Sequence, residues 1–563
     1  MKPHARLAAL IAAISLTSSI AFAAAPSAGA ANTADGRPNI LVIVADDLGF
    51  SDIGAFGGEI ATPNLDRLAQ SGLRLSQFHT AATCSPTRAM LMSGTDHHIA
   101  GIANMSELIT PEQRGKPGYE GALNEHVVTI AELLRDAGYA TLMSGKWHLG
   151  IAPQQNPAQR GFERSFALLQ AGHNHFGKPN IPPPELGGAT YTENGKPVQL
   201  PKDFYSSDFF TDKLLEYLRA DAGAGKPFFA YLPFTAPHWP LQAPQASIDK
   251  YKGRYDAGWD VLRQQRIARQ RELGVLPAHA DTSAPATLGD WNALSAEQKQ
   301  RQARAMEIFA AMVDRMDWNI GRVLDYLQAN GQLDNTLIVF FSDNGAEGGN
   351  AAHILHQLMG GKLPAPALAQ MGNADSVVSY GPNWAQAAMA PRRLYKAVST
   401  EGGISSPAII RFPGFARQHQ VDASFATVMD IMPTLLDLAK TTYPTGNYHG
   451  RTIAPAGGKS MLPFLMNRSD RVHSDSETFG WELFGQRALR QGHWKITYVS
   501  APNGSGHWEL YDLAQDPGER RDVSAQHPDI AKQLIAQWDV YSSDMGIILH
   551  EQVVSPYTDQ FVD

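Results

Sequence analysis

The chain alternates short, wholly apolar runs with longer segments in which apolar residues recur every three or four positions. Continuous apolar runs rich in β-branched residues are typical of strands that are buried on both faces of a sheet. The predicted strands are Asn39–Ala45, 139–144, 228–232 and 337–341. Together they predict the core of a large sheet.

Amphipathic segments lie between these runs. Thr62 and Pro63 predict the N-cap and first position of a helix that ends at Gly72. Thr129 and Glu132 form a capping-box pattern at the start of a second helix. A third, long helix carries one apolar stripe, made of Phe309, Met312, Val313, Met316, Ile320, Val323, Leu324 and Leu327. Buried strands that alternate with amphipathic helices predict an α/β sandwich around a mixed, mostly parallel central sheet.

The same alternation predicts a main domain over residues 37–465, interrupted twice. A segment at about 250–305 is rich in Arg, Gln and Ala, which favours helical insertions. A segment at 346–392 is rich in Gly, Ala, Met and Pro, which favours a long functional loop or lid. Short aromatic strands and a terminal helix in 466–563 predict a smaller α+β subdomain with an antiparallel sheet.

The N-terminus has the pattern of a secretory signal peptide. Lys2 and Arg6 precede an apolar run at 7–25 that is too short and polar for a good membrane span. A small-x-small triplet near its end predicts removal of residues 1–23, followed by a loose segment at 24–36. A buried N-terminal helix is the less favoured alternative. We therefore expect a bacterial protein that is periplasmic or secreted.

Composition narrows the class of protein. The chain is 43% hydrophobic and 18% charged, which is ordinary for a globular protein, and no second apolar run approaches membrane length. The formal net charge is -8 and basic residues form no block with aromatics, which disfavours nucleic acid as a partner. The single cysteine, Cys84, excludes an intrachain disulfide. That cysteine is either a small buried apolar side chain or a residue with a chemical role.

Polar residues follow the predicted strands at their carboxyl ends, where open α/β sheets place their sites. These residues are Asp46, Asp47, Lys146, His148, His238, Asp343 and Asn344. Each alone has a structural explanation, such as a helix cap, a turn or a surface pair. Three carboxylates and one amide together offer hard oxygen ligands, which suit Ca²⁺ or Mg²⁺ better than zinc, with Ca²⁺ preferred. Nearby lysine, arginine and histidine predict a tetrahedral oxyanion ester as the substrate.

The segment Cys84-Ser85-Pro86-Thr87-Arg88 resembles the Cys/Ser-x-Pro-x-Arg motif of the type I sulfatase family. In that family the motif directs conversion of its first residue to formylglycine. The resemblance covers nearly the whole mature chain, with PNI at 38–40, TPNLD at 62–66, GKWHLG at 145–150, APH at 236–238, SDNG at 342–345, Lys396, EGG at 401–403 and LYDL at 510–513. GTDHH at 94–98 looks most like bacterial arylsulfatases, whereas ISSP at 404–407 replaces an Arg-Val pair of many relatives.

This resemblance implies an alkaline phosphatase-like fold and hydrolysis of sulfate monoesters. By analogy, Asp46, Asp47, Asp343 and Asn344 bind one Ca²⁺ together with an oxygen of the modified Cys84. The hydrated formylglycine is a geminal diol, of which one hydroxyl attacks sulfur and expels the alcohol or phenol. The other hydroxyl then loses its proton, so that the aldehyde re-forms and sulfate leaves.

The resemblance also implies roles for the remaining site residues. Asp343 is the base for attack, while Arg88 and Lys146 orient the aldehyde hydrate. His148 takes the proton during sulfate release. His238 and Lys396 contact sulfate and protonate the departing oxygen. His97 and His98 could line the pocket or support the cysteine helix, and both interpretations stay open.

Two other functions also fit these residues. A phosphonate monoester or phosphodiester hydrolase of the same superfamily would use a similar site, because sulfate and phosphate esters share shape and charge placement. A non-catalytic protein that binds sulfated glycans would keep the fold and an ordinary thiol at residue 84. An enzyme that generates formylglycine is the expected maturation partner. Trp384 and the methionines of the predicted lid hint at an apolar or aromatic leaving group, although sulfated sugars stay possible.

Overall fold

The computed structural model describes residues 36–181, 188–221, 225–349, 355 and 365–549. The predicted signal peptide at 1–23 and nearly all of the loose segment at 24–36 lie outside these residues. Part of the predicted lid also lies outside them. Among the described helices, none is both long and apolar enough to span a membrane.

An 11-stranded sheet forms the centre of the molecule, in the order β10-β2-β9-β8-β1-β7-β3-β4-β5-β6, with β11 paired to β2. Its strands are β1 Asn39–Ala45, β2 Leu73–His79, β3 Ala140–Lys146, β4 Arg164–Leu168, β5 Tyr191–Glu193, β6 Lys196–Pro197, β7 Phe228–Pro233, β8 Thr336–Ser342, β9 Ser405–Arg411, β10 Gln420–Asp422 and β11 Ala426–Thr427. The neighbours β8, β1, β7, β3 and β4 are all parallel, whereas β9 runs antiparallel to β8. This mixed, mostly parallel sheet confirms the fold class predicted from the sequence.

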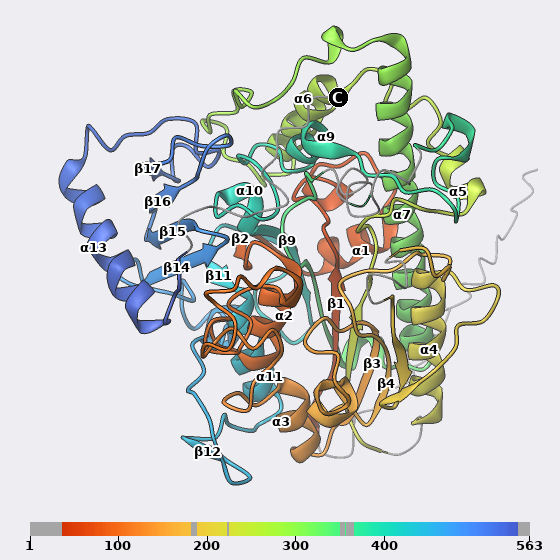
Figure 1. The fold of residues 1–563 in the computed structure, drawn as a ribbon. Coiled ribbons are helices and arrows are strands. Elements are labelled where there is room, and N and C mark those ends of the chain that lie inside the picture. Colours follow the sequence, from red (N-terminus) through yellow and green to blue (C-terminus); the bar gives the residue numbers. More distant parts are fainter. Residues whose placement is uncertain (1–35, 182–187, 222–224, 350–354, 356–364, 550–563) are drawn as a thin grey trace, which may run out of the picture.

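The two faces of the sheet pack against two separate hydrophobic cores. Leu41 and Ile43 of β1 point into one core, and Ile40 and Val42 into the other, because successive side chains of a strand alternate between faces. The first core is covered by α1 Pro63–Ser71, α4 Ser206–Ala220, α7 Ala296–Ala329 and α9 Gly381–Ala388. The second is covered by α2 Cys84–Ser93, α3 Ile130–Asp136, α11 Ile431–Leu438 and α12 Leu462–Leu465. Figure 1 shows α4 and α7 on the right of the sheet and α2, α3 and α11 on the left.

Helix starts follow the sequence signals with one exception. Thr129 accepts from the Glu132 N–H at 3.1 Å and the Glu132 carboxylate accepts from the Thr129 N–H at 2.8 Å, which is the predicted capping box. Thr62 precedes α1, but its hydroxyl makes no cap hydrogen bond and instead accepts from the Gly54 N–H at 2.9 Å. The predicted stripe of α7 is buried along its whole length, and the helix begins earlier, at a capping box on Ser295.

The segment predicted as helical insertions forms α6 Trp259–Glu272 and the first turns of α7, joined by irregular chain. Trp384, predicted to line the lid, is instead a core residue. It is fully buried, packs against Tyr255, Trp259 and Trp291, and donates its indole N–H to Gln302 O at 3.0 Å. It therefore lends no support to an aromatic leaving group.

A separate antiparallel sheet forms the C-terminal subdomain, at the left of Figure 1. It consists of β14 Thr478–Leu483, β15 Gln486–Gln491, β16 Trp494–Tyr498 and β17 Trp508–Asp512. Helix α13 Pro528–Asp544 packs Leu534 and Trp538 against Leu489, Ile496 and Leu510 of this sheet. Apart from 3-10 helices, the other short elements of the described residues are α5 Gln245–Asp249, α10 Glu401–Ile404, β12 Asn447–Tyr448 and β13 Arg451–Thr452.

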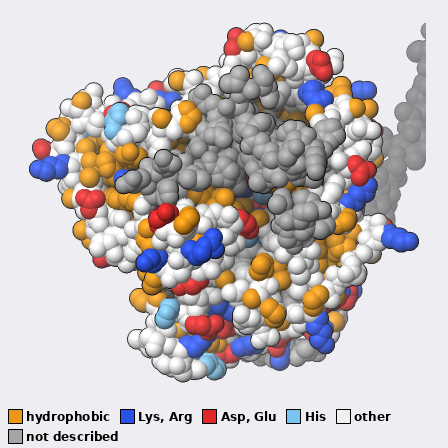
Figure 2. All heavy atoms as spheres, in the orientation of Figure 1, with side chains coloured by type: hydrophobic (Ala, Val, Ile, Leu, Met, Phe, Trp, Pro, Cys, Tyr) orange, Lys and Arg blue, Asp and Glu red, His pale blue; other side chains and the backbone are white. Residues whose placement is uncertain are grey.

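Acidic and basic side chains are interspersed over the described atoms of the face drawn in Figure 2. Neither sign forms a continuous block on that face. This mixture agrees with the modest net charge of -8.

Candidate active site

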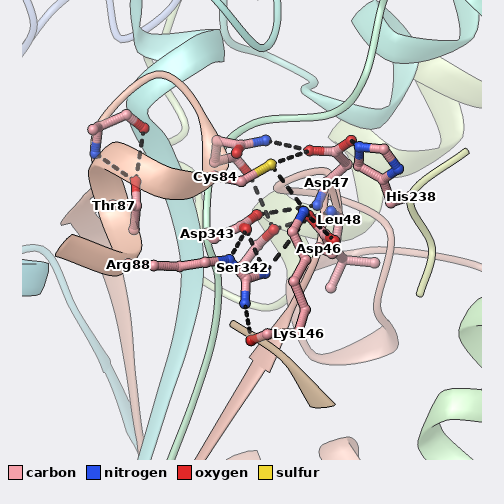
Figure 3. Close-up of polar contacts among 12 residues, drawn as sticks. Asp46, Asp47, Leu48, Cys84, Thr87, Arg88, Lys146, His238, Ser342 and Asp343 are labelled. Atoms are coloured by element: carbon pink, nitrogen blue, oxygen red, sulfur yellow. Dashed lines mark hydrogen bonds and ion pairs between the residues drawn. The ribbon is translucent and has the colours of Figure 1, made fainter. Parts of the chain in front are cut away.

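The parallel strands bring the predicted site residues to one edge of the sheet. Asp46 and Asp47 directly follow β1, Lys146 ends β3, and Asp343 directly follows β8. Cys84 begins α2, so its side chain lies at the helix N-terminus beside these strand ends (Figure 3). These strands are far apart in sequence, but they are parallel, so their carboxyl ends lie at the same edge of the sheet.

Cys84 lies against the carboxylates that follow β1. Its Sγ donates to Asp46 Oδ1 at 3.3 Å and is 3.9 Å from Asp47 Oδ1 (Figure 3). Asp46, Asp47, Cys84 and Asp343 each contribute a ligand-type atom, and these atoms all lie within 4.8 Å of one another. Asp47 adopts a left-handed conformation with φ 66°, which aspartate tolerates better than most residues and which turns the chain sharply after β1.

Each carboxylate of the cluster is paired with a buried cation. Lys146 Nζ donates to both oxygens of Asp46, at 3.0 and 2.7 Å. Arg88 donates to Asp343 Oδ2 from Nε at 3.0 Å and from Nη2 at 2.6 Å. Buried charges are tolerated when they are paired and hydrogen-bonded, and each of these side chains is fully buried.

Lys396 provides the third cation. Its Nζ lies 2.9 Å from Asp47 Oδ2 and 3.0 Å from Glu347 Oε2. Burial alone would raise the pKa of Asp47, but Lys396, His238 and Lys146 outweigh it and lower that pKa to about 2. Burial likewise lowers the pKa of Lys146, but the Asp46 carboxylate outweighs it and raises that pKa above its ordinary value. These groups are therefore ionised near neutral pH.

Two other groups have raised pKa values. Burial, with a further contribution from the Asp46 carboxylate, raises the pKa of Asp343 to about 6. Burial and the charge of Asp343 raise the pKa of the Cys84 thiol well above its ordinary value. A thiol held in its protonated form is a poor nucleophile, so this environment does not activate an ordinary cysteine.

The donor set fits a hard divalent cation. Asn344 donates its amide N–H to Asp47 Oδ1 at 2.6 Å and to Gly345 O at 2.8 Å. Its Oδ1 is buried and has no hydrogen-bond partner among the described residues. An unpaired buried amide oxygen is costly unless a ligand uses it, and here it accompanies three carboxylates. Oxygen donors of this kind suit Ca²⁺, which takes many oxygen ligands in flexible geometry.

The two histidines differ in their contacts. His238 Nδ1 lies 2.5 Å from Trp239 O and therefore carries the proton, while its Nε2 lies 3.6 Å from Asp47 Oδ2. Burial lowers the pKa of His238 well below its ordinary value. His148 Nε2 lies 3.2 Å from Glu107, and its buried Nδ1 has no partner among the described residues. All predicted site residues except His148 thus form one hydrogen-bonded or ion-paired cluster.

Two acidic residues of the site were missed by the sequence reasoning. Glu347 pairs with Lys396, and it lies only three residues after Asn344, so its position in the segment was an available signal. Glu107 pairs with His148, but it lies in a short 3-10 helix that follows no strand end. Only the tertiary structure connects Glu107 to the site.

His97 and His98 lie outside the cluster. His98 lies 2.7 Å from Asp96 through Nδ1 and 3.3 Å from Glu482 of β14 through Nε2. Tyr541 of α13 donates to the other oxygen of Asp96 at 2.8 Å. These contacts join the chain after α2 to the C-terminal subdomain, which favours a structural role for the histidine pair.

The residues of ISSP at 404–407 form the end of α10 and the start of β9. Ser406 Oγ accepts from the Ser342 N–H at 2.7 Å, at the end of β8. Ser405 Oγ donates to Glu401 Oε2 at 3.0 Å. Ile404 is buried in a small core with Trp481 and Leu483. The two serines that stand where many relatives carry an Arg-Val pair therefore make hydrogen bonds with Ser342 and Glu401.

Comparisons with known proteins agree on one family. Residues 38–441 match the sulfatase family. An uncharacterized sulfatase of Schizosaccharomyces pombe is 48% identical over 530 residues, covering 91% of this chain and 94% of that protein. An arylsulfatase of Klebsiella aerogenes is 42% identical over 428 residues, covering 74% of this chain and 91% of that protein.

Solved structures share the fold. The crystal structure of Ps i-CgsB in complex with k-i-k-neocarrahexaose has a TM-score of 0.65 and 25% identity, covering 92% of this chain and 95% of that chain. Phosphonate monoester hydrolase of Agrobacterium radiobacter has a TM-score of 0.56 and 20% identity, covering 91% and 96% of the two chains. The alkaline phosphatase-like architecture of this chain is therefore shared with a phosphonate monoester hydrolase, and the fold by itself does not identify the ester that is cleaved.

Proposed function

The chain belongs to the sulfatase family, and we propose that within it the protein is a calcium-dependent arylsulfatase that uses a formylglycine made from Cys84. Family membership supports hydrolysis of sulfate esters. The position of Cys84 is the observation that supports formylglycine chemistry: it is the first residue of the buried helix α2, and its Sγ faces Asp46 and Asp47. Its thiol pKa is raised, mainly by burial, so the unmodified residue is a poor nucleophile there.

The oxygens of Asp46, Asp47, Asp343 and Asn344 would hold the Ca²⁺. When bound, Ca²⁺ supplies positive charge for a sulfate oxygen and for the nucleophilic hydroxyl of the hydrated aldehyde. Lys146 and Arg88 keep the carboxylates in fixed positions, since each cation is itself buried and hydrogen-bonded. The site is thus organised before substrate arrives, which lowers the cost of reorganisation during reaction.

Proton transfers follow from the contacts of the histidines and Lys396. Neutral His238 has its lone pair on Nε2, because Nδ1 carries the proton toward Trp239 O, so His238 does not share the expected role of protonating the departing oxygen. Lys396 is protonated between Asp47 and Glu347, so it can donate to the oxygen of the departing alcohol or phenol. His148 has a buried, unpartnered Nδ1 among the described residues, and this atom can accept the proton lost on sulfate release.

The preference for aryl sulfates is drawn from the 42% identical arylsulfatase, and glycan sulfates are the second candidate substrates. The second candidate has its own support, because relatives of this chain include an N-acetylgalactosamine-6-sulfatase of Homo sapiens at 27% identity. Parallel assays with an aryl sulfate and with sulfated monosaccharides separate the two. Export to the periplasm or medium remains part of the proposal, on the strength of the N-terminal sequence pattern.

Mass spectrometry of the tryptic peptide that contains residue 84 tests the mechanism. The protein should come from its native host or from co-expression with a formylglycine-generating enzyme. Conversion of the thiol to the aldehyde changes the peptide mass, and a hydrazide reagent should label the product. A Cys84→Ala variant should fold and lose sulfate ester hydrolysis. Active protein with a wholly unmodified Cys84 would overturn the proposal.

A further inference from the structure

Lys396 is held between two carboxylates at the edge of the cluster. Its Nζ lies 2.9 Å from Asp47 and 3.0 Å from Glu347. Asp47, His238 and Glu347 each present an atom, and these atoms lie within 4.8 Å of one another. An anion that accepts a hydrogen bond from Lys396 Nζ therefore lies no more than about 6 Å from the Glu347 carboxylate, because both contact the same nitrogen. Glu347 is itself only 3% exposed.

Glu347 differs from the other carboxylates of the site. Asp46, Asp47 and Asp343 surround Cys84 in the oxygen cluster that fits a divalent cation, and Glu347 does not belong to that cluster. Its carboxylate instead lies beside Lys396 and His238, so its negative charge acts on any ligand bound there. A buried carboxylate this close to a bound anion repels that anion, so it needs a functional explanation.

The local backbone fixes Glu347 in place. Its Oε1 accepts from the Gly349 N–H at 2.6 Å. The Lys396 N–H donates to Ala346 O at 3.0 Å, which joins the two chain segments beside the ion pair. A Cβ added to Gly348 would lie 2.3 Å from the Tyr395 ring, so this glycine permits the close approach. Glu347 has little freedom to withdraw from an incoming anion.

We propose that Glu347 is a specificity-determining residue that favours monoanionic sulfate esters over dianionic phosphate monoesters. A sulfate monoester carries one negative charge, and an aryl phosphate monoester carries two above the second phosphate pKa of about 6. The repulsion from one fixed carboxylate doubles when the charge on the ligand doubles. Glu347 thus weakens binding of both esters but weakens binding of the dianion more.

The formal charges of the site agree with this role. With all carboxylates ionised and both histidines neutral, the cluster around Cys84 and Lys396 has four carboxylates, which are Asp46, Asp47, Asp343 and Glu347. Glu107 is left out of this count because it pairs with His148, outside the cluster, and its side chain is 44% exposed. The cluster has three cations, which are Arg88, Lys146 and Lys396. A divalent cation leaves one net positive charge, which a monoanion neutralises and a dianion exceeds. Without Glu347 the balance would suit a dianion.

The test compares kcat/KM for an aryl sulfate and the matching aryl phosphate at pH 8 in the mature wild-type enzyme and in Glu347→Gln. Burial raises the pKa of Glu347 to about 6, so the wild-type carboxylate is ionised at pH 8. We expect the sulfate-to-phosphate ratio to fall by about 10- to 100-fold in the variant. An unchanged or increased ratio overturns the inference.

Three further variants make the test specific. Glu347→Asp keeps the charge and should keep the ratio within about threefold of the wild type. Asp325→Asn removes a carboxylate that is 75% exposed and paired with Arg67, and it should leave the ratio unchanged. Glu347→Asn supplies a second neutral side chain in case Glu347→Gln does not fold, as judged by thermal unfolding. A ratio that falls equally in Asp325→Asn or Glu347→Asp also overturns the inference.

The inference rests on the proposed function, and the experiment separates the two failures. If mature wild-type enzyme hydrolyses no sulfate ester, the proposed function fails. If the wild type hydrolyses the aryl sulfate but the neutral variants keep its ratio, only the role of Glu347 fails.

Discussion

The ammonium group of Lys495, on β16 of the C-terminal subdomain, lies 2.9 Å from Oε1 of Glu401, the first residue of α10. Lys495 also lies 2.9 Å from Glu519, and Glu519 in turn accepts from the Glu401 N–H at 2.9 Å. All three side chains are buried. The C-terminal subdomain therefore joins the main domain through a buried ionic network, and one member of it, Glu401, lies five residues after Lys396 in sequence.

Replacing Lys495 should destabilise the protein strongly. Lys495→Ala leaves Glu401 and Glu519 buried without their shared cation, which costs about 3–5 kcal/mol in the free energy of unfolding. Lys459→Ala is the matched control, because Lys459 pairs with Glu477 at the surface and is 54% exposed, so it should cost less than about 1 kcal/mol. Urea unfolding of both variants measures the difference, and equal losses would contradict the network's role.

Metal removal should lower stability as well as activity. If the oxygen cluster binds Ca²⁺, adding the ion to chelator-treated protein should raise the unfolding midpoint, with about 2.7 kcal/mol gained at one hundred times the Kd. Asn344→Ala removes the unpaired amide oxygen and should reduce this gain. Thermal unfolding with and without Ca²⁺ measures it. A midpoint that does not respond to Ca²⁺ in the wild type counts against the site.

The link at His98 should weaken as pH rises. Burial lowers the pKa of His98, but Asp96 and Glu482 outweigh it and raise that pKa to about 9. Since the folded pKa lies above the unfolded value of about 6.5, this contribution is complete below pH 6.5 and disappears as pH rises toward 9. We expect a loss on the order of 2–3 kcal/mol over this interval.

Unfolding experiments across that pH range, with His98→Gln for comparison, measure this contribution. His97, whose ring is tilted against that of His98 with centroids 4.1 Å apart, stays in both proteins. The stability of His98→Gln should be lower at pH 6.5 and should change less up to pH 9. Parallel curves for the two proteins would show that His98 is not the group responsible.

Trp384 should matter for stability more than for substrate choice. Trp384→Ala removes a fully buried ring from a cluster with Trp259 and Trp291, which costs about 3–5 kcal/mol. The KM for an aryl sulfate should remain close to that of the wild type at a temperature where both proteins are folded. A large increase in KM with unchanged stability would place Trp384 at the substrate instead.

The sequence by itself determined the four central strands and placed the candidate site residues after them. Each buried strand is a local run of apolar residues, and parallel strands present their carboxyl ends at one edge of a sheet. Asp46, Lys146 and Asp343 could therefore be assigned to one place from their positions after these runs. The motif at Cys84 could be recognised because its residues are contiguous. These features depend on short-range pattern, which a single sequence contains.

The tertiary structure decided which charges compensate one another and which residues are core. Lys396 and Asp47 are separated by 349 positions, and their pairing follows from folding rather than from either segment. Glu107 reaches His148, and Trp384 reaches the core, for the same reason. Burial removes water from these groups, and the resulting free energies depend on which side chains lie within a few ångströms. The order of residues within one short segment does not specify the distances to side chains of other segments.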